Sequence, residues 1–221
     1  MTTDELARRP SGEPLITAEN LGPEVPRRGT AFTQRLGLAW LRLMGWKVTG
    51  TPPTLPKAIF IGAPHTSNRD GLVAAATILA LRLRITVMAK AELFKGPIGS
   101  FFRWADVMPV YRSSAQRGGQ VEQVIERFRQ NENIYIGIAP EGTRHASEKW
   151  KTGFYHMAVK AGVPILPFIL DFGRKELRMT PAFYPTGDME ADMAELISRY
   201  KGVIPADPSR LSGPLRENPP S

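Results

Sequence analysis

Short apolar runs alternate with longer amphipathic segments through the middle of this chain, and that alternation limits the folds open to it. Short runs rich in valine and isoleucine are typical of buried strands. The expected strands are 57–63, 84–90, 106–112, 132–140 and 163–172. The expected helices are 70–83, 91–103, 115–130, 151–161 and 188–201. The pattern therefore predicts an α/β fold with a mostly parallel central sheet flanked by helices.

A sixth apolar run, 177–185, is a weaker strand candidate because Pro181 interrupts it. Proline cannot donate a hydrogen bond to a neighbouring strand, which places this run at an edge of the predicted sheet. A length of 221 residues without an internal linker indicates a single domain, expected over 29–204. The polar, proline-bearing ends at 1–28 and 205–221 are predicted to be a flexible arm and a flexible tail.

The chain is strongly basic, with a formal net charge of +8 and an isoelectric point of about 10.0. This charge favours an anionic partner, such as lipid headgroups, a phosphorylated substrate or nucleic acid. The sequence carries no nucleic-acid recognition motif, so nucleic acid is not among the expected partners. It also lacks a signal-peptide core and an apolar run long enough to span a bilayer. We therefore expect a cytoplasmic protein that can associate peripherally with a membrane.

Residues 29–47 predict a basic amphipathic helix. At 100° per residue, Trp40 and Trp46 fall on one broad apolar face, while Arg35 and Arg42 fall on another. One interpretation places the helix in the interface of a membrane that contains anionic lipids. The other packs it on the protein core, with the arginines extending into water. The helix alone does not favour either interpretation.

His65 and Asp70 stand on the connection between the strand expected at 57–63 and the following helix. In parallel sheets, functional groups collect on the loops at the carboxyl ends of the strands. A carboxylate that fixes the tautomer of an imidazole makes the other ring nitrogen a better base. By itself the pair is a weak signal, because a histidine hydrogen-bonded in a structural loop is the commoner case.

The run Pro140–Arg144 follows the end of another expected strand. Gly142 permits a turn that exposes backbone N–H groups, and the Arg144 guanidinium can bind phosphate through two parallel hydrogen bonds. Arg112 ends a neighbouring expected strand, so it would form a two-arginine anion pocket with Arg144 beside His65. The run has Thr-Arg where a nucleotide-binding loop requires Lys-Ser or Lys-Thr, which argues against nucleotide hydrolysis.

These stretches resemble, in order, the four conserved blocks of the glycerolipid acyltransferases, the lysophosphatidic acid acyltransferase family. His65 and Asp70 match the H-x-x-x-x-D block, and Arg112 matches the arginine that ends the second block. Pro140–Arg144 matches the third block, and the apolar run Val163–Pro167 matches the fourth. The resemblance covers about residues 30 to 170, and its specificity comes from the agreement of four ordered blocks.

The resemblance implies a glycerol-3-phosphate acyltransferase-like fold and a transfer reaction on the cytosolic face of a membrane. His65 would take the proton from a free hydroxyl of a lysophospholipid, most simply lysophosphatidic acid, as it attacks an acyl thioester. Asp70 would orient the imidazole. The phosphate would be held by arginines in a pocket formed by the remaining implied site residues: Arg112, Glu141, Gly142, Thr143 and Arg144.

The acyl donor would be acyl-CoA or an acyl carrier protein, acting as co-substrate. No metal or other cofactor is expected, because the three histidines lack metal-ligand spacing and the chain has no cysteine. With neither cysteine nor a G-x-S-x-G sequence, direct transfer is favoured over a covalent acyl-enzyme. Two alternatives remain: the same chemistry on a lyso-lipid acceptor without phosphate, and a non-catalytic basic lipid-binding module.

Overall fold

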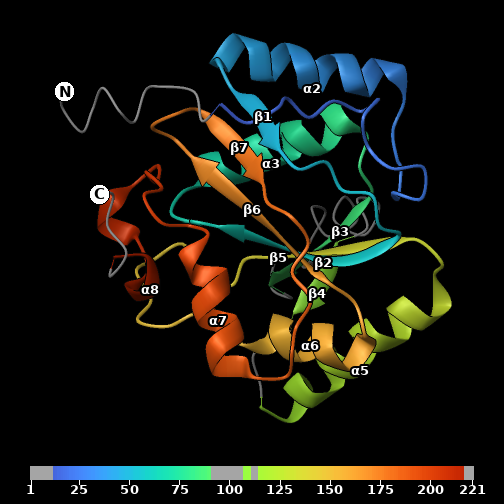
Figure 1. The fold of residues 1–221 in the computed structure, drawn as a ribbon, viewed down its shortest axis with the longest axis vertical. Coiled ribbons are helices and arrows are strands. Elements are labelled where there is room, and N and C mark those ends of the chain that lie inside the picture. The colour runs from blue at the N-terminus through green and yellow to red at the C-terminus, as the bar shows by residue number, and fades with distance from the viewer. Residues whose placement is uncertain (1–11, 91–106, 111–113, 217–221) are drawn as a thin grey trace.

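The computed structural model describes residues 12–90, 107–110 and 114–216. Figure 1 shows a central sheet with helices on both faces. The helices are α2 (Ala31–Met44), α3 (Asn68–Leu81), α5 (Ser114–Gln130), α6 (Gly153–Ala161), α7 (Met189–Ser198) and α8 (Gly213–Arg216). The strands are β1 (Lys47–Gly50), β2 (Lys57–Ala63), β3 (Ile85–Lys90), β4 (Met108–Val110), β5 (Ile134–Ile138), β6 (Ile165–Asp171) and β7 (Glu176–Met179).

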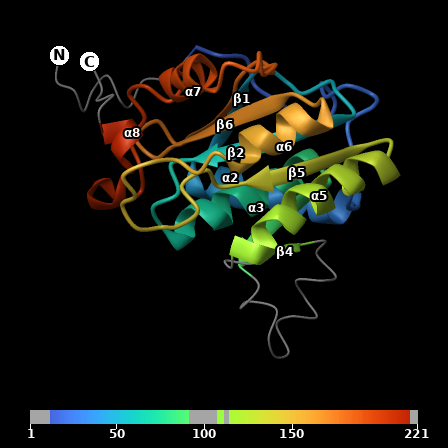
Figure 2. The same ribbon diagram turned by 90° about the horizontal axis from the view of Figure 1, so that it is seen from below.

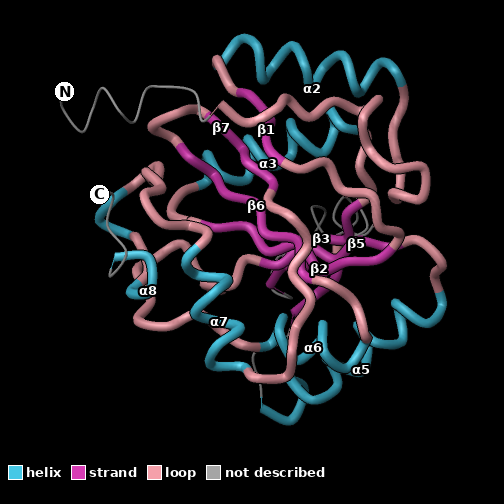
Figure 3. The backbone as a smooth tube through the Cα atoms, viewed as in Figure 1, coloured by secondary structure: helices cyan, strands magenta, loops and turns pink. Residues whose placement is uncertain are grey.

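The described strands are arranged in the order β1-β7-β6-β2-β5-β3-β4. Every neighbouring pair is parallel except β6 and β7, which are antiparallel. The sheet runs through the middle of the molecule between two layers of helices (Figure 3). The prediction of an α/β fold with a mostly parallel sheet is therefore confirmed.

The central strand β2 shows how the two layers are held. Ile59, Ile61 and Ala63 point into the core under α5, α6 and α7, while Ala58 and Phe60 point into the core under α2 and α3. Both faces of the strand are buried, as expected for a continuous apolar run in a parallel sheet. On the first of these faces α5 and α6 lie side by side, as seen from below in Figure 2.

Helix α2 packs on α3 through a close approach at Gly37. A Cβ atom at this position would lie 2.6 Å from the carbonyl oxygen of Ala76 on α3, so only glycine fits. Gly37 and Leu41 are the buried residues of α2, whereas Phe32, Leu36 and Leu43 are exposed. The helix thus packs on the protein with one side and leaves apolar side chains on the other. In the described part of the chain, no helix has the length and apolar character needed to cross a bilayer.

The structure corrects the prediction of flexible ends where it describes them. Ile16, Leu21 and Val25 are buried in the core under α2, and the Ile16 N–H donates to Val48 O at 2.8 Å. At the other end, residues 205–216 contain the 3₁₀ turn Pro208–Arg210 and helix α8 rather than a free tail. Both segments are held by single apolar side chains without a period, which sequence patterns do not detect.

The predicted edge position of the 177–185 run is also wrong. Strand β7 ends at Met179, before Pro181, so the proline does not interrupt its pairing. β7 lies between β1 and β6, and β1, which was not predicted as a strand, forms that edge of the sheet. The helix expected at 91–103 falls outside the described residues.

Candidate active site

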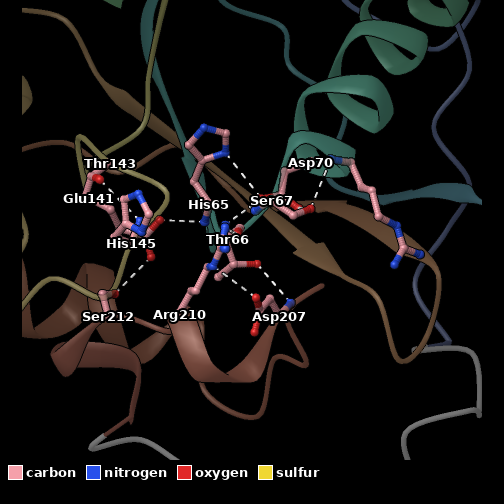
Figure 4. A network of polar contacts seen from close by, with 11 residues as sticks. His65, Thr66, Ser67, Asp70, Glu141, Thr143, His145, Asp207, Arg210 and Ser212 are labelled. Carbon is pink, nitrogen blue, oxygen red and sulfur yellow. Dashed lines mark hydrogen bonds and ion pairs between the residues drawn. The ribbon is translucent and has the colours of Figure 1, made fainter.

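The loop after β2 and the loop after β5 lie beside each other because the two strands are parallel neighbours. His65 is on the first loop, and Glu141 to Arg144 are on the second. The predicted meeting of these two stretches at one edge of the sheet therefore agrees with the structure. Figure 4 shows the residues that the two loops bring together.

Asp70 occupies the first turn of α3, where the backbone fixes its carboxylate. Its Oδ2 atom accepts hydrogen bonds from the N–H groups of Thr66 at 2.6 Å and Ser67 at 2.7 Å. Ser67 is the N-cap of α3, and its hydroxyl lies 3.2 Å from Asp70 Oδ1. This capping box places a carboxylate at the positive end of the helix, where it stabilises the turn.

His65 turns its ring toward this carboxylate (Figure 4). Its Nδ1 atom lies 3.4 Å from Asp70 Oδ2, which leaves Nε2 for a substrate. The Asp70 side chain is 2% exposed, whereas that of His65 is 31% exposed. A buried, oriented carboxylate behind a partly accessible imidazole is the geometry of a general base.

Glu141 is buried behind His65, with only 2% of the residue exposed. Its Oε2 atom accepts the His65 N–H at 2.5 Å, and its Oε1 atom accepts the Ser212 hydroxyl at 3.0 Å. Trp150 Nε1 donates to the same hydroxyl at 3.1 Å. Burial raises the pKa of Glu141 above its ordinary value. Although Glu141 was expected to shape the substrate pocket, its carboxylate is directed at the backbone of His65.

A cavity of about 380 Å³ opens beside the His65 loop. Its lining residues come from three segments and are Ser67, Asn68, Arg144, His145 and Arg210. Arg144 makes no hydrogen bond or ion pair with any other residue that the structure describes. Its guanidinium is therefore available to an anion in the cavity.

The other predicted residues of the second loop shape its backbone. Gly142 has a φ of 64°, in the left-handed region, and its N–H donates to Ala139 O at 3.0 Å. The Thr143 hydroxyl accepts the His145 N–H at 3.2 Å. Arg112 lies outside the described residues, so the predicted pairing of two arginines stays a prediction. Within the described residues, no group of acidic or histidine side chains is arranged to hold a metal ion.

Sequence reasoning missed the residues that the C-terminal segment brings to the site. Arg210 lines the cavity, and Ser212 holds Glu141. Both lie in a stretch rich in proline and serine that looks like a free tail, so no local pattern indicates their position. Their contacts join residues more than seventy positions apart: Ser212 is 71 positions from Glu141 in the chain.

Comparisons with known proteins identify the family of this chain. The family model described as Acyltransferase matches residues 47–171. The 1-acyl-sn-glycerol-3-phosphate acyltransferase of Escherichia coli K12 is 31% identical over 66% of this chain and 60% of its own length. The human 1-acyl-sn-glycerol-3-phosphate acyltransferase beta is 28% identical over 56% of this chain and 46% of its own length. The chain thus spans about half to three fifths of these curated relatives.

The fold also has a counterpart among solved structures. The crystal structure of the 1-acyl-sn-glycerophosphate acyltransferase PlsC from Thermotoga maritima superposes with a TM-score of 0.50 at 20% identity. The match covers 73% of this chain and 72% of that one. The family model spans more than half of the chain and includes both loops of the site. The chain therefore belongs to the acyltransferase family.

Proposed function

We propose that this protein transfers a fatty acyl group from an acyl thioester to the free hydroxyl of a lysophospholipid. Lysophosphatidic acid is the acceptor that fits best, and phosphatidic acid would be the product. The observation that carries the proposal is the His65–Asp70 pair on a loop whose residues Ser67 and Asn68 line a cavity together with Arg144. The names of the curated relatives support the same acceptor.

In the proposed reaction, His65 Nε2 takes the proton of the acceptor hydroxyl while the hydroxyl oxygen attacks the thioester carbonyl carbon. The resulting tetrahedral intermediate collapses with cleavage of the carbon–sulfur bond. The imidazolium returns its proton to the departing thiolate, so that an ester and a free thiol are formed. Asp70 stabilises the imidazolium through Nδ1, which lies 3.4 Å from its carboxylate.

General-base catalysis by a positioned side chain contributes about 10²–10⁴-fold to the rate. The remainder must come from alignment of the two substrates and stabilisation of the oxyanion. Because the chain has no cysteine, the acyl group passes directly to the acceptor in this scheme. The donor can be acyl-CoA or an acyl carrier protein, and no further cofactor takes part.

The acceptor phosphate is assigned to Arg144, whose guanidinium has no partner in the described part of the chain. A planar guanidinium can bind two phosphate oxygens at once, which suits a monoester headgroup. Gly142 and Thr143 set the path of the loop that carries it. Arg112 keeps the role that the family resemblance gives it, as a second phosphate ligand.

We also propose that the face formed by α2 and α3 docks on a membrane that contains anionic lipids. Exposed apolar side chains lie along both helices: Phe32, Leu36 and Leu43 on α2, and Leu72 and Leu79 on α3. Arg35 and Arg42 are exposed on α2, and each basic residue near such a surface adds about 1 kcal/mol to binding. Since α3 also begins with the His65–Asp70 turn, docking here would keep the catalytic loop near the lipids.

The proposal is tested with the purified protein and a matched pair of acceptors. Lysophosphatidic acid and monoacylglycerol differ only in the phosphate, and each is offered with acyl-CoA and with an acyl carrier protein. Mass spectrometry should find phosphatidic acid as the main product, with diacylglycerol formed much more slowly. Thioesters that survive with every acceptor would refute the acyltransferase activity. Equal rates with the two acceptors would refute the phosphate pocket and favour the alternative acceptor class.

A further inference from the structure

We infer that Arg210, in the C-terminal segment, is a further cationic ligand for the phosphate of the acceptor, in addition to the arginines of the family-like blocks. The inference rests on the proposed function, because it assigns a further residue to the same acceptor site. Arg210 lies outside the four family-like blocks, in a stretch that the sequence predicts to be a tail. Together with Arg144 it lines the cavity beside the His65 loop, to which that loop contributes Ser67 and Asn68.

The C-terminal segment is fastened to the loop that carries His65. The Asp207 N–H donates to the Thr66 hydroxyl at 3.2 Å, and Arg210 Nη1 lies 3.5 Å from the Thr66 carbonyl oxygen. Thr66 is fully buried and directly follows His65 in the chain. The position of Arg210 is therefore tied to that of the proposed base, as the close-up in Figure 4 shows.

The same segment is fastened to the loop that carries Arg144. Ser212 donates to Glu141, and the Gly213 N–H donates to Ser147 O at 2.8 Å. Because these contacts hold the segment on both sides of the cavity, Arg210 is presented from a fixed backbone. An arginine whose position is fixed before the phosphate arrives loses less conformational entropy when it binds the phosphate.

The Arg210 guanidinium is oriented by an ion pair but keeps hydrogen-bond donors for a ligand. Its Nε atom lies 3.1 Å from Asp207 Oδ2, which leaves N–H donors of the terminal nitrogens for a ligand. The Asp207 carboxylate also accepts the Ser209 hydroxyl at 2.6 Å and the Ser209 N–H at 3.1 Å. These hydrogen bonds, first that from the hydroxyl, lower the pKa of Asp207, a group that is already charged near neutral pH. The ion pair with Asp207 therefore fixes the orientation of the Arg210 guanidinium.

The charges around the cavity suit a phosphate monoester. Arg144 and Arg210 supply two positive charges, while Asp207 is the only acidic side chain that pairs with either of them in the described residues. Ser67 and Asn68 line the cavity at the start of α3, whose positive end is occupied by the Asp70 carboxylate, so the attraction for a ligand anion comes from the arginines. Since Asp207 balances only one of these two positive charges, the other is available to the anionic ligand.

The inference is tested on the full-length protein with Arg210→Gln, Arg210→Lys and the matched control Arg216→Gln. The Arg216 side chain is on the same segment as Arg210 and is 44% exposed, compared with 43% for Arg210. It pairs with Glu148 and does not line the cavity. KM for lysophosphatidic acid is measured with a phosphate-free acyl thioester as donor, so that only the acceptor carries phosphate. We expect Arg210→Gln to raise this KM about tenfold, in line with the loss of one charged hydrogen-bonding group. The KM of Arg210→Lys should lie between those of wild type and Arg210→Gln, and the KM of Arg216→Gln should match that of wild type.

A second series uses monoacylglycerol with acyl-CoA, in which only the donor carries phosphate. KM values for both of these substrates should stay within about twofold of wild type in Arg210→Gln. A higher KM for acyl-CoA alone would assign Arg210 to the donor, and equal losses in both series would show a merely structural role. Either result overturns the inference, as does an unchanged KM for lysophosphatidic acid.

Binding of glycerol 3-phosphate, followed by NMR titration, tests Arg210 without any turnover. Wild type and Arg216→Gln should bind it with the same Kd, and Arg210→Gln should bind it at least about fivefold more weakly. Absence of binding to wild type, or equal binding by all three proteins, refutes the phosphate site. If binding follows this pattern while no thioester is consumed, only the proposed function fails.

Discussion

His65 and Arg144 follow adjacent parallel strands, β2 and β5, but their loops are held to different degrees. In the His65 loop, the N–H groups of His65, Thr66 and Ser67 all donate to buried carboxylates, those of Glu141 and Asp70. The Arg144 side chain is exposed and has no polar partner in the described part of the chain. The loop of the proposed base is thus held by the fold, whereas the proposed phosphate ligand is free of protein partners among the described residues.

The difference follows from what each loop would have to do. A reacting group must be aligned closely with the bond that it attacks, and a displacement of about 1 Å can cost 10²-fold in rate. A phosphate ligand must hold a charge but can approach it from several directions. The comparison therefore predicts that damage to the His65 loop lowers kcat, while damage to the cavity raises KM for the acceptor.

Asp70→Asn should give the largest effect of the variants that probe this comparison. The amide has nearly the same shape but lacks the charge that stabilises the imidazolium, so kcat should fall about 10²-fold or more. KM for lysophosphatidic acid should change by less than about threefold. Steady-state kinetics give both constants, and circular dichroism verifies that the variant is folded. A rise in KM with an unchanged kcat would contradict the assignment of Asp70 to the chemical step.

Arg144→Gln tests the second loop of the comparison and should change KM for the acceptor rather than kcat. Loss of the guanidinium should raise KM for lysophosphatidic acid about tenfold and leave kcat within about threefold. Arg144→Lys keeps the charge but not the two parallel donors, so it should recover part of the loss. A fall in kcat as large as that of Asp70→Asn would show that the two loops do not divide the work in this way.

A smaller effect is expected at the proposed membrane face, away from both loops. Leu43 on α2 is 83% exposed, and Leu43→Asp should weaken binding to anionic vesicles about three- to tenfold. Val159→Asp on α6, an exposed position in the opposite helix layer, is the matched control and should bind like wild type. Vesicle sedimentation measures both. Equal losses in the two variants would point to charge alone rather than to a docking face.

The subtlest effect concerns the stability of the His65 loop. Burial raises the folded-state pKa of Glu141, so its proton is lost more easily from the unfolded chain. Relative to Glu141→Gln, wild type should lose stability as pH rises from about 4.3, the unfolded value, through the folded pKa. Urea unfolding of both proteins between pH 4 and pH 8 gives this difference. A difference that does not vary with pH would contradict the buried, protonatable carboxylate.

The sequence predicted the meeting of His65 with the Pro140–Arg144 run because both follow strands of a parallel sheet. That rule needs only the order of strands and helices, and the apolar runs supply it. The helix predicted at 70–83 begins two residues earlier, at Asn68, because Ser67 and Asp70 form a capping box at its start.

The sequence could not predict contacts that depend on long-range packing. Ser212 and Arg210 reach the site because Leu215 is buried and the segment pairs with two distant loops. Glu141 sits in a run that suggests a pocket wall, but its direction depends on Ser212 and Trp150, which no local pattern connects to it. Ile16, Leu21 and Val25 were likewise missed, since three isolated apolar residues in a polar stretch carry no period.

The central claim is that His65 removes the proton from the acceptor hydroxyl, and the most direct measurement is thiol release by His65→Ala. His156→Ala, which alters an exposed histidine on α6, is the matched control. With lysophosphatidic acid and an acyl thioester, His65→Ala should release thiol at least about 10²-fold more slowly than wild type, and His156→Ala at the wild-type rate. Release by a folded His65→Ala protein within a few fold of an active wild type would contradict the account.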